Sequence, residues 1–276
     1  MSAVVHSAPA TRWRPSPFVM ASIAVHVGAA AAVVLGPEYW TWWALGAIGA
    51  NQVALTGLGL WPRSTWLGPN FTRLPAAAAA RGEIALTFDD GPDPEVTPKV
   101  LDLLDAYGAR ATFFCIAQHA RRHPELVHAI TRRGHAVENH SCGHPVTFSM
   151  MGLAGIRKEI VSAQGALTEL GGRAPRFFRP PAGLRNPLLD PVLHEQGLRL
   201  VSWTRRGFDT RRNDPDRVAA TLLEGLAAGD ILLLHDGHAA RGSNGTPVAL
   251  AVLPRLFDAA RRQGLRFVTL DQAIDP

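Results

Sequence analysis

The sequence predicts an α/β fold, a distorted, incomplete (β/α) barrel of about seven strands, preceded by an N-terminal two-helix transmembrane hairpin. From residue 81 onward, short apolar runs alternate with amphipathic helical patterns, which is typical of a parallel sheet with helices packed outside. Before residue 63, two long runs carry no charged side chain. The length of 276 residues leaves room for one large domain and such an appendage.

The first charge-free run lies between Arg14 and Glu38, and the second lies between Glu38 and Arg63. Each run matches the roughly 20 apolar residues that cross a bilayer. Tryptophan and tyrosine cluster around the ends of the runs, where amphipathic rings favour the headgroup region. We therefore expect a tail over residues 1–16 and a membrane hairpin over residues 17–62. The alternative is a cleaved signal peptide followed by a buried core helix, but the first run lacks a convincing small-residue cleavage site.

The charges that flank these runs predict their orientation. Five arginines lie outside the two runs, whereas the connector between them holds only Glu38. The five are Arg12, Arg14, Arg63, Arg73 and Arg81. Since positively charged flanks stay in the cytoplasm, we expect a cell-membrane protein whose main domain faces the cytoplasm. Within the spans, His26, Asn51 and Gln52 are expected to form hydrogen bonds between the helices.

Residues 63–81 are predicted to be a linker, in which an alanine run could form a short helix, and residues 82–276 are predicted to be the main domain. Its strands are expected at 83–88, 110–115, 135–139, 176–179, 198–203, 230–235 and 266–270. Helices are expected around 97–107, 119–133, 153–170, 187–196, 215–228 and 247–263. Glycine-containing turn signals separate the elements. This number of repeats suits a barrel slightly short of eight units.

The charge composition argues against nucleic-acid binding. The net charge is +5, but the arginines occur singly or in pairs and form no long basic tract. Scattered arginines on a membrane-bound protein more often indicate a solvated face or attraction to anionic lipid. The two cysteines, Cys115 and Cys142, do not suggest a disulfide framework. Nothing in the sequence indicates a protein partner.

Polar side chains follow several of the predicted strands. They are Asp89 and Asp90 after the first strand, His140 and His144 after the third, and Arg179, Asp209 and His235 after later ones. Because the carboxyl ends of parallel strands meet at one end of a barrel, these groups are expected to converge there.

One carboxylate with two imidazoles is a recognised ligand set for a divalent metal ion. The adjacent acids Asp89 and Asp90 would repel each other, and a cation bound to one of them would offset that repulsion. A metal-bound water has a lowered pKa, and a second carboxylate beside it can take its proton. Taken alone, the stretch HSCGH could be a polar loop without metal. The convergence of the other groups at strand ends favours a metal-dependent hydrolytic site.

These motifs resemble the polysaccharide deacetylase family, the carbohydrate-esterase-type enzymes with a NodB homology domain, over roughly residues 82–273. The matching motifs are TFDDGP at 87–92, HSCGH at 140–144, RPPAG at 179–183 and LLLHD at 232–236. In the third motif, Ala182 replaces the usual aromatic residue. The fourth motif is partly present, because Asp209 matches its second aspartate, whereas Arg206 and Thr210 replace its first aspartate and its tryptophan. These departures indicate a substrate different from long chitin-like chains.

The resemblance implies that Asp90, His140 and His144 hold one divalent ion, with Zn²⁺ favoured over Co²⁺, Ni²⁺ or Mn²⁺. Asp89 would then be the general base that activates the water. Arg179 would keep this carboxylate ionised and aimed through a charge-assisted hydrogen bond.

The resemblance also implies that His235 is the general acid that protonates the leaving amine, and that Asp209 raises its pKa by ion pairing. A backbone N–H at Ala182 would stabilise the oxyanion, and Pro181 would lie beside the substrate. His238 follows no motif spacing and is expected at the pocket rim.

The implied function is a membrane-anchored hydrolase that removes an N-acetyl or N-formyl group from an amino sugar of a glycan or a lipid-linked saccharide. An extracytoplasmic deacetylase of a cell-wall polysaccharide, peptidoglycan or chitin-like, is the alternative within the same chemistry. An alternative of a different class is a non-catalytic, glycan-binding pseudoenzyme. Such a protein would have lost one of the five central groups, and none of Asp89, Asp90, His140, His144 and His235 is lost.

Overall fold

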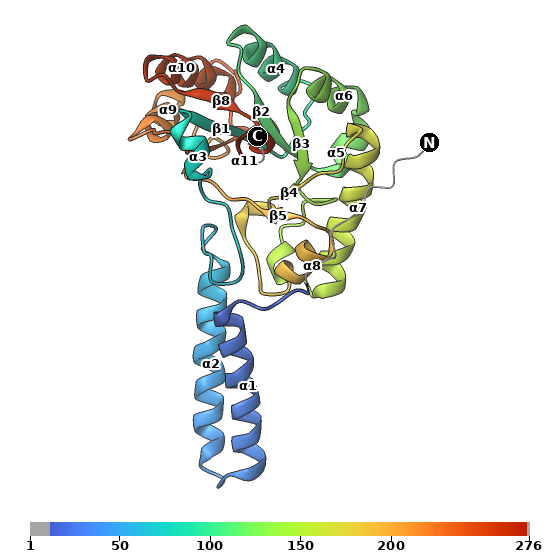
Figure 1. Cartoon of the computed structure of the whole chain (residues 1–276), viewed down its shortest axis with the longest axis vertical. Coiled ribbons are helices and arrows are strands. Elements are labelled where there is room, and N and C mark those ends of the chain that lie inside the picture. Colours follow the sequence, from blue (N-terminus) through green and yellow to red (C-terminus); the bar gives the residue numbers. More distant parts are fainter. Residues whose placement is uncertain (1–11, 275–276) are drawn as a thin grey trace.

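The structure is a computed structural model that describes residues 12–274, and Figure 1 shows an α/β domain carried on a long helical hairpin. The strands are β1 (Glu83–Asp89), β2 (Ala111–Cys115), β3 (Ala136–Asn139), β4 (Phe177–Phe178), β5 (Arg199–Leu200), β6 (Arg205–Arg206), β7 (Ile231–His235) and β8 (Arg266–Val268). The hairpin and the connecting segment hold α1 (Pro17–Leu35), α2 (Trp40–Gly59) and α3 (Ala76–Ala80). The domain holds the helices α4 (Thr97–Ala106), α5 (Ala117–Arg122), α6 (Pro124–Arg132), α7 (Leu153–Gly171), α8 (Leu189–Glu195), α9 (Pro215–Leu223), α10 (Val248–Arg262) and α11 (Leu270–Ile274).

The sheet confirms the predicted incomplete barrel. Its strands follow the order β5-β4-β3-β2-β1-β7-β6, and β8 pairs with the first half of β1. Every pairing between these strands is parallel. The central strand β1 is buried along its whole length, as expected when elements cover both faces of a parallel sheet. The carboxyl ends of β1, β3 and β7 therefore lie at one end of the domain.

Two predicted elements differ from the structure, and one strand was not predicted. The region 198–203 contains a strand of only two residues, and β6 follows it as a further short strand that was not predicted. The predicted helix 119–133 is two helices, α5 and α6, which meet at His123 and Pro124. Proline has no N–H to continue the hydrogen bonding of α5 and disfavours helical backbone in the residue before it, so the chain starts a new helix there.

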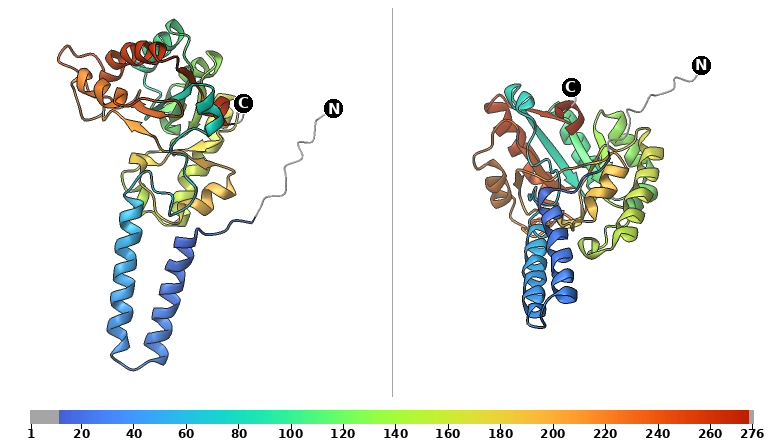
Figure 2. Two further views of the ribbon diagram at one scale, coloured as in Figure 1. Left: turned by 60° about the vertical axis from the view of Figure 1, so that its left-hand side comes forward. Right: turned by 60° about the horizontal axis from the view of Figure 1, so that its bottom comes forward.

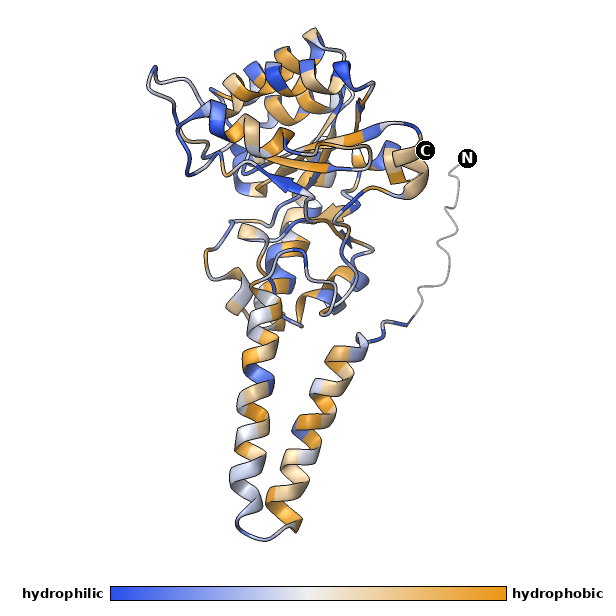
Figure 3. Ribbon diagram, turned by 90° about the vertical axis from the view of Figure 1, so that its left-hand side faces the viewer, coloured by the Kyte–Doolittle hydropathy of each residue, from blue (hydrophilic) through white to orange (hydrophobic). Residues whose placement is uncertain are grey.

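The N-terminal hairpin consists of α1 and α2, which run side by side and are joined by a short turn (Figures 1 and 2). The predicted contacts between the helices are confirmed, because Asn51 Nδ2 donates to Ser22 Oγ at 2.8 Å and Gln52 Nε2 lies 3.4 Å from His26 Nε2. Among the helices of residues 12–274, α1 alone is long and apolar enough to span a membrane, and Figure 3 shows its apolar character. The second helix has lower hydropathy because it contains four glycines, Asn51 and Gln52.

The segment from 63 to 81 is packed against the domain. Phe71 forms a parallel bridge with Val201, which extends the sheet beyond β5, and Leu74 N donates to Gly229 O at 2.8 Å. The alanine run forms the short helix α3. The connecting segment therefore adds backbone pairing to the edge of the sheet.

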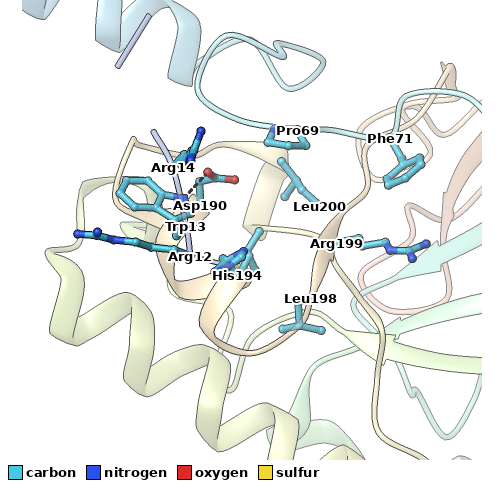
Figure 4. A pocket seen from close by; sticks show the side chains of 11 residues that line it. Arg12, Trp13, Arg14, Pro69, Phe71, Asp190, His194, Leu198, Arg199 and Leu200 are labelled. Atoms are coloured by element: carbon cyan, nitrogen blue, oxygen red, sulfur yellow. Dashed lines mark hydrogen bonds between the residues drawn. The ribbon is translucent and has the colours of Figure 1, made fainter. Parts of the chain in front are cut away.

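The hairpin is fastened to the domain on both of its ends. At the end of α2 and just after it in the chain, Arg185 forms two contacts. Its backbone N–H donates to Gly59 O at 3.2 Å, and its buried guanidinium donates to Ser64 O at 2.5 Å. In the segment that precedes α1 in the chain, Trp13 Nε1 donates to Asp190 Oδ2 at 2.8 Å in a pocket beside α8 (Figure 4). These contacts hold the base of the hairpin at a fixed place on the domain.

Candidate active site

Three potential metal ligands meet at the carboxyl ends of β1 and β3. Asp90 Oδ1 lies 3.3 Å from His140 Nε2 and 3.2 Å from His144 Nε2. The ligand atoms of these three residues all lie within 4.8 Å of one another. The carboxylate follows β1 directly, and its positive φ of 72° turns the side chain away from the strand direction. The structure thus brings together the three residues that were predicted from the sequence to be metal ligands.

The hydrogen bonding of this cluster fits a bound cation. His140 Nδ1 lies 2.7 Å from the carbonyl oxygen of Arg179, so this nitrogen carries the proton and Nε2 is left as an acceptor. Asp90 Oδ1 is buried and has no hydrogen-bond partner among the described residues. In the neutral form of His140, Nε2 and Asp90 Oδ1 are both acceptors and would repel each other at 3.3 Å, and either a proton on Nε2 or a divalent ion between them removes that conflict.

The electrostatics of the cluster also favour a positive charge. Burial lowers the pKa of His140, but the charges of Asp89 and Asp90 outweigh this effect and raise it overall. Burial raises the pKa of Asp90, but its contacts with His140 and His238 outweigh that effect and lower it overall. The site therefore stabilises a cation, whether a proton or a metal ion.

A carboxylate from α7 holds the loop that carries the two histidines. Glu159 Oε2 accepts hydrogen bonds from Cys142 N at 3.0 Å and Gly143 N at 2.8 Å. The side chain of Asn139 accepts the N–H of Ser141 at 2.9 Å, where the backbone has a positive φ of 70°. Glu159 could not be predicted from the sequence, because one glutamate in an amphipathic helix resembles any other solvated acid.

The predicted base is held by the predicted arginine. Arg179 is fully buried, and its Nη1 donates to Asp89 Oδ1 at 2.7 Å and to Thr87 Oγ1 at 2.8 Å. Nη2 donates to Ser202 O at 2.8 Å, and the guanidinium lies 4.1 Å from the centre of the Phe114 ring. This set of contacts fixes one oxygen of Asp89, while the other lies 3.9 Å from Nε2 of His140, one of the three potential ligands.

The predicted acid is held in the same manner. Asp209 Oδ1 lies 2.9 Å from His235 Nδ1, and its Oδ2 accepts the backbone N–H of the same residue at 2.8 Å. Burial lowers the pKa of His235, but the hydrogen bond and charge of Asp209 outweigh it, so that the pKa is raised overall. With Nδ1 bound to the aspartate, Nε2 is the nitrogen that can transfer a proton.

A cavity of about 290 Å³ joins these groups. Its lining includes Asp89, Asp90, His140, His144 and His235, together with Ala182, Gly183, Trp203, Arg206, Thr210, Leu233 and His238. Ala182 has a positive φ of 55° within the turn Pro181–Gly183. Pro181 is buried and is not among the residues that line the cavity. Arg179 and Asp209 lie behind the lining and contact it through the base and the acid.

Two histidines near Asp90 have contacts that motif matching did not predict. His238 lines the cavity, as expected for a rim residue, but its Nδ1 also lies 3.4 Å from Asp90 Oδ2. His119 Nδ1 lies 2.9 Å from the carbonyl oxygen of Asp90. Spacing could not reveal either contact, because both depend on how α5 and the loop after β7 pack around the end of β1.

The half-barrel and the paired acids and bases at its strand ends define a hydrolase of the carbohydrate-esterase type. The chain belongs to the polysaccharide deacetylase family, whose model matches residues 77–201. It is 33% identical over 212 residues to a peptidoglycan-N-acetylglucosamine deacetylase of Bacillus cereus. The matched region covers 76% of this chain and 92% of that relative.

A chitooligosaccharide deacetylase of a Bradyrhizobium species is 32% identical over 196 residues, with 68% of this chain and 89% of the relative covered. Among solved structures, a peptidoglycan N-acetylglucosamine deacetylase in complex with 4-naphthalen-1-yl-N-oxidanyl-benzamide matches with a TM-score of 0.67 and 30% identity. That match covers 74% of this chain and 92% of the other. The predicted family is confirmed, and so is its hydrolase class.

Proposed function

We propose that this protein is a membrane-anchored, metal-dependent hydrolase that removes an N-acetyl or N-formyl group from an amino sugar. The observation that carries the proposal is the single cavity where the Asp90–His140–His144 cluster meets the Asp89–Arg179 and Asp209–His235 pairs. The names of the relatives support N-acetylglucosamine as the sugar. None of the five central residues is replaced, which speaks against the pseudoenzyme alternative.

Each group of residues in the site has a separate role in the proposed reaction. Asp90, His140 and His144 would hold the ion, with Zn²⁺ the best match to one carboxylate and two imidazoles. When bound, the ion supplies Lewis acidity to the amide carbonyl and to a water molecule. Asp89, held by Arg179, takes the proton of the attacking water, and His235 delivers a proton to the departing amine. The backbone N–H of Ala182 contributes a hydrogen bond to the oxyanion.

Anchoring by the hairpin is supported by its surface. Large apolar side chains on α1 and α2 are exposed, including Val34, Trp42, Trp43 and Val53, each about three-quarters exposed. A contiguous apolar surface of this kind is unfavourable in water and favourable in lipid. The paired polar groups Ser22, His26, Asn51 and Gln52 face each other inside the hairpin, as expected for helices packed within a bilayer.

We further propose that the domain faces the cytoplasm and acts on a lipid-linked amino sugar. The arginines outside the hairpin support this orientation. The position of the cavity supports a substrate at the membrane surface, since Gly183 in its lining lies against Pro62, three residues after α2. The alternative is an extracytoplasmic peptidoglycan deacetylase, which the names of the relatives favour.

Two measurements test these proposals. Full-length protein purified in detergent should release acetate or formate from N-acylated amino sugars, and no release from any of them would contradict the activity. For orientation, a reporter fused after Pro276 should be fluorescent as green fluorescent protein and inactive as alkaline phosphatase. Strong phosphatase activity from an intact fusion would reverse the topology and favour the peptidoglycan alternative.

A further inference from the structure

Arg206 is a cation in the cavity that the proposed chemistry does not use. It lies on β6, where it pairs in parallel register with Leu233 of β7, two residues before His235. Arg206 and Leu233 both line the cavity. The residue thus lies on the wall beside the proposed acid.

The guanidinium of Arg206 contacts two aromatic rings, and its Nε has no acceptor in the part of the chain that the structure describes. It lies 5.3 Å from the centre of the Trp203 ring and 5.2 Å from that of Phe208. Its Nε is buried without a hydrogen-bond partner, and the side chain forms no ion pair with any residue between 12 and 274. The neighbouring Arg205, in contrast, pairs with Asp230 at 2.5 Å. A buried donor without an acceptor is unfavourable, and a ligand that supplies one removes the penalty.

The carboxylates in the site are already engaged elsewhere. Asp89 pairs with Arg179, Asp209 pairs with His235, and Asp90 faces the histidines of the metal cluster. Arg206 also shares the Trp203 ring with Arg179, whose guanidinium lies 5.8 Å from the ring centre. Of these two guanidiniums beside the Trp203 ring, Arg179 has a carboxylate partner, whereas no ion pair of Arg206 is found among residues 12–274.

We infer that Arg206 binds an anionic oxygen group, a carboxylate or a phosphate, carried by the amino-sugar substrate. A planar guanidinium that lies over two aromatic rings is well suited to such a group, which can accept two of its N–H donors at once. The inference rests on the proposed function, since it names the substrate class of that same site. A phosphate would come from a sugar phosphate, and a carboxylate from an acidic substituent of the sugar.

The test compares three probes on the full-length protein in detergent by calorimetry: N-acetylglucosamine, N-acetylglucosamine 1-phosphate and N-acetylmuramic acid. At least one acidic sugar should bind wild-type protein about tenfold more tightly than the neutral one, as expected for a charge-assisted hydrogen bond. Arg206→Gln should abolish this difference, and Arg206→Lys should restore part of it. The acidic sugar that shows the gain identifies the source of the anion.

Arg212→Gln is the matched control, because Arg212 also lies over Phe208 but donates to Thr221 outside the cavity. It should leave the difference between acidic and neutral probes unchanged. Equal binding of all three probes by wild-type protein, or a difference that persists in Arg206→Gln, would overturn the inference. A protein that prefers an acidic sugar through Arg206 but releases neither acetate nor formate would refute the proposed function and leave this inference standing.

Discussion

The two sides of the cavity differ in how their polar groups are held in place. One side, called the catalytic wall after its proposed role, holds Asp89, Asp90, His140, His144 and His235. Arg179 donates to Asp89, Asp209 pairs with His235, and the carbonyl oxygen of Arg179 faces His140 Nδ1. The variable wall is formed by Ala182, Trp203, Arg206 and Thr210. There the sequence departs from the family motifs, and Arg206 has a buried nitrogen with no hydrogen-bond partner between residues 12 and 274.

We interpret this difference as a division of roles, in which the catalytic wall carries out the reaction and the variable wall selects the substrate. Proton transfer needs groups held within tenths of an ångström, and the proposed base Asp89 and acid His235 each have a second residue that orients them. A substrate-binding wall needs only to match the group that the substrate presents. Its polar atoms can therefore be unpaired in the free protein and form their hydrogen bonds with the substrate. Changes in the catalytic wall should therefore slow all substrates alike, whereas changes in the variable wall should alter the preference among them.

The largest effect should separate the two adjacent aspartates of the catalytic wall. Asp89→Asn should lose about 100-fold to 10,000-fold in turnover and keep its metal, because the base is removed while the ligands remain. Asp90→Asn should lose metal as well. Metal content measured by mass spectrometry, beside acetate release, distinguishes the two variants. Equal metal loss in both would show that the base is misassigned.

A smaller effect should follow from loosening the loop that carries the histidines. Glu159→Ala leaves Cys142 N and Gly143 N without their acceptor and should weaken metal affinity by roughly tenfold to a hundredfold. Competition with a chromogenic chelator measures this affinity. Glu169→Ala, an exposed change on the same helix, is the control and should have no effect. Unaltered affinity in Glu159→Ala would remove this glutamate from the support of the site.

The smallest effect in the catalytic wall should be a change in pH dependence. Asp209 raises the pKa of His235, so the acid stays protonated to higher pH than a free imidazole. Asp209→Asn should lower that pKa, move the alkaline limb of the activity profile to lower pH and reduce turnover about tenfold on the alkaline side. Profiles of kcat against pH measure the shift. An unmoved alkaline limb would exclude His235 as the group that sets it.

The catalytic wall could be predicted from the sequence because its residues follow strands, and parallel strands bring their ends together. The strand β1 illustrates this, since its apolar run and the acids after it are visible in the sequence itself. The contacts of Glu159, His119 and His238 could not be predicted, because each depends on the packing of a helix or loop. The short edge strand β6 was missed for a similar reason, since two arginines show no β pattern and pair only because β7 lies beside them.

The variable wall was visible in the sequence only as a set of departures from the motifs. Arg206 and Thr210 stand where an aspartate and a tryptophan are usual, but the sequence could not show that Arg206 would lie between Trp203 and Phe208. That arrangement depends on the turn between β6 and Asp209, where Phe208 has a positive φ of 62°.

The central claim is that Asp90, His140 and His144 hold an ion on which hydrolysis depends. The most direct test measures bound metal and acetate release together, in wild-type protein and in His140→Ala, before and after chelation. We expect about one divalent ion per chain in wild-type protein, loss of activity on chelation and its recovery when Zn²⁺ is restored. We expect little metal and little activity in His140→Ala under all conditions. Full metal content with normal turnover in His140→Ala would contradict the account.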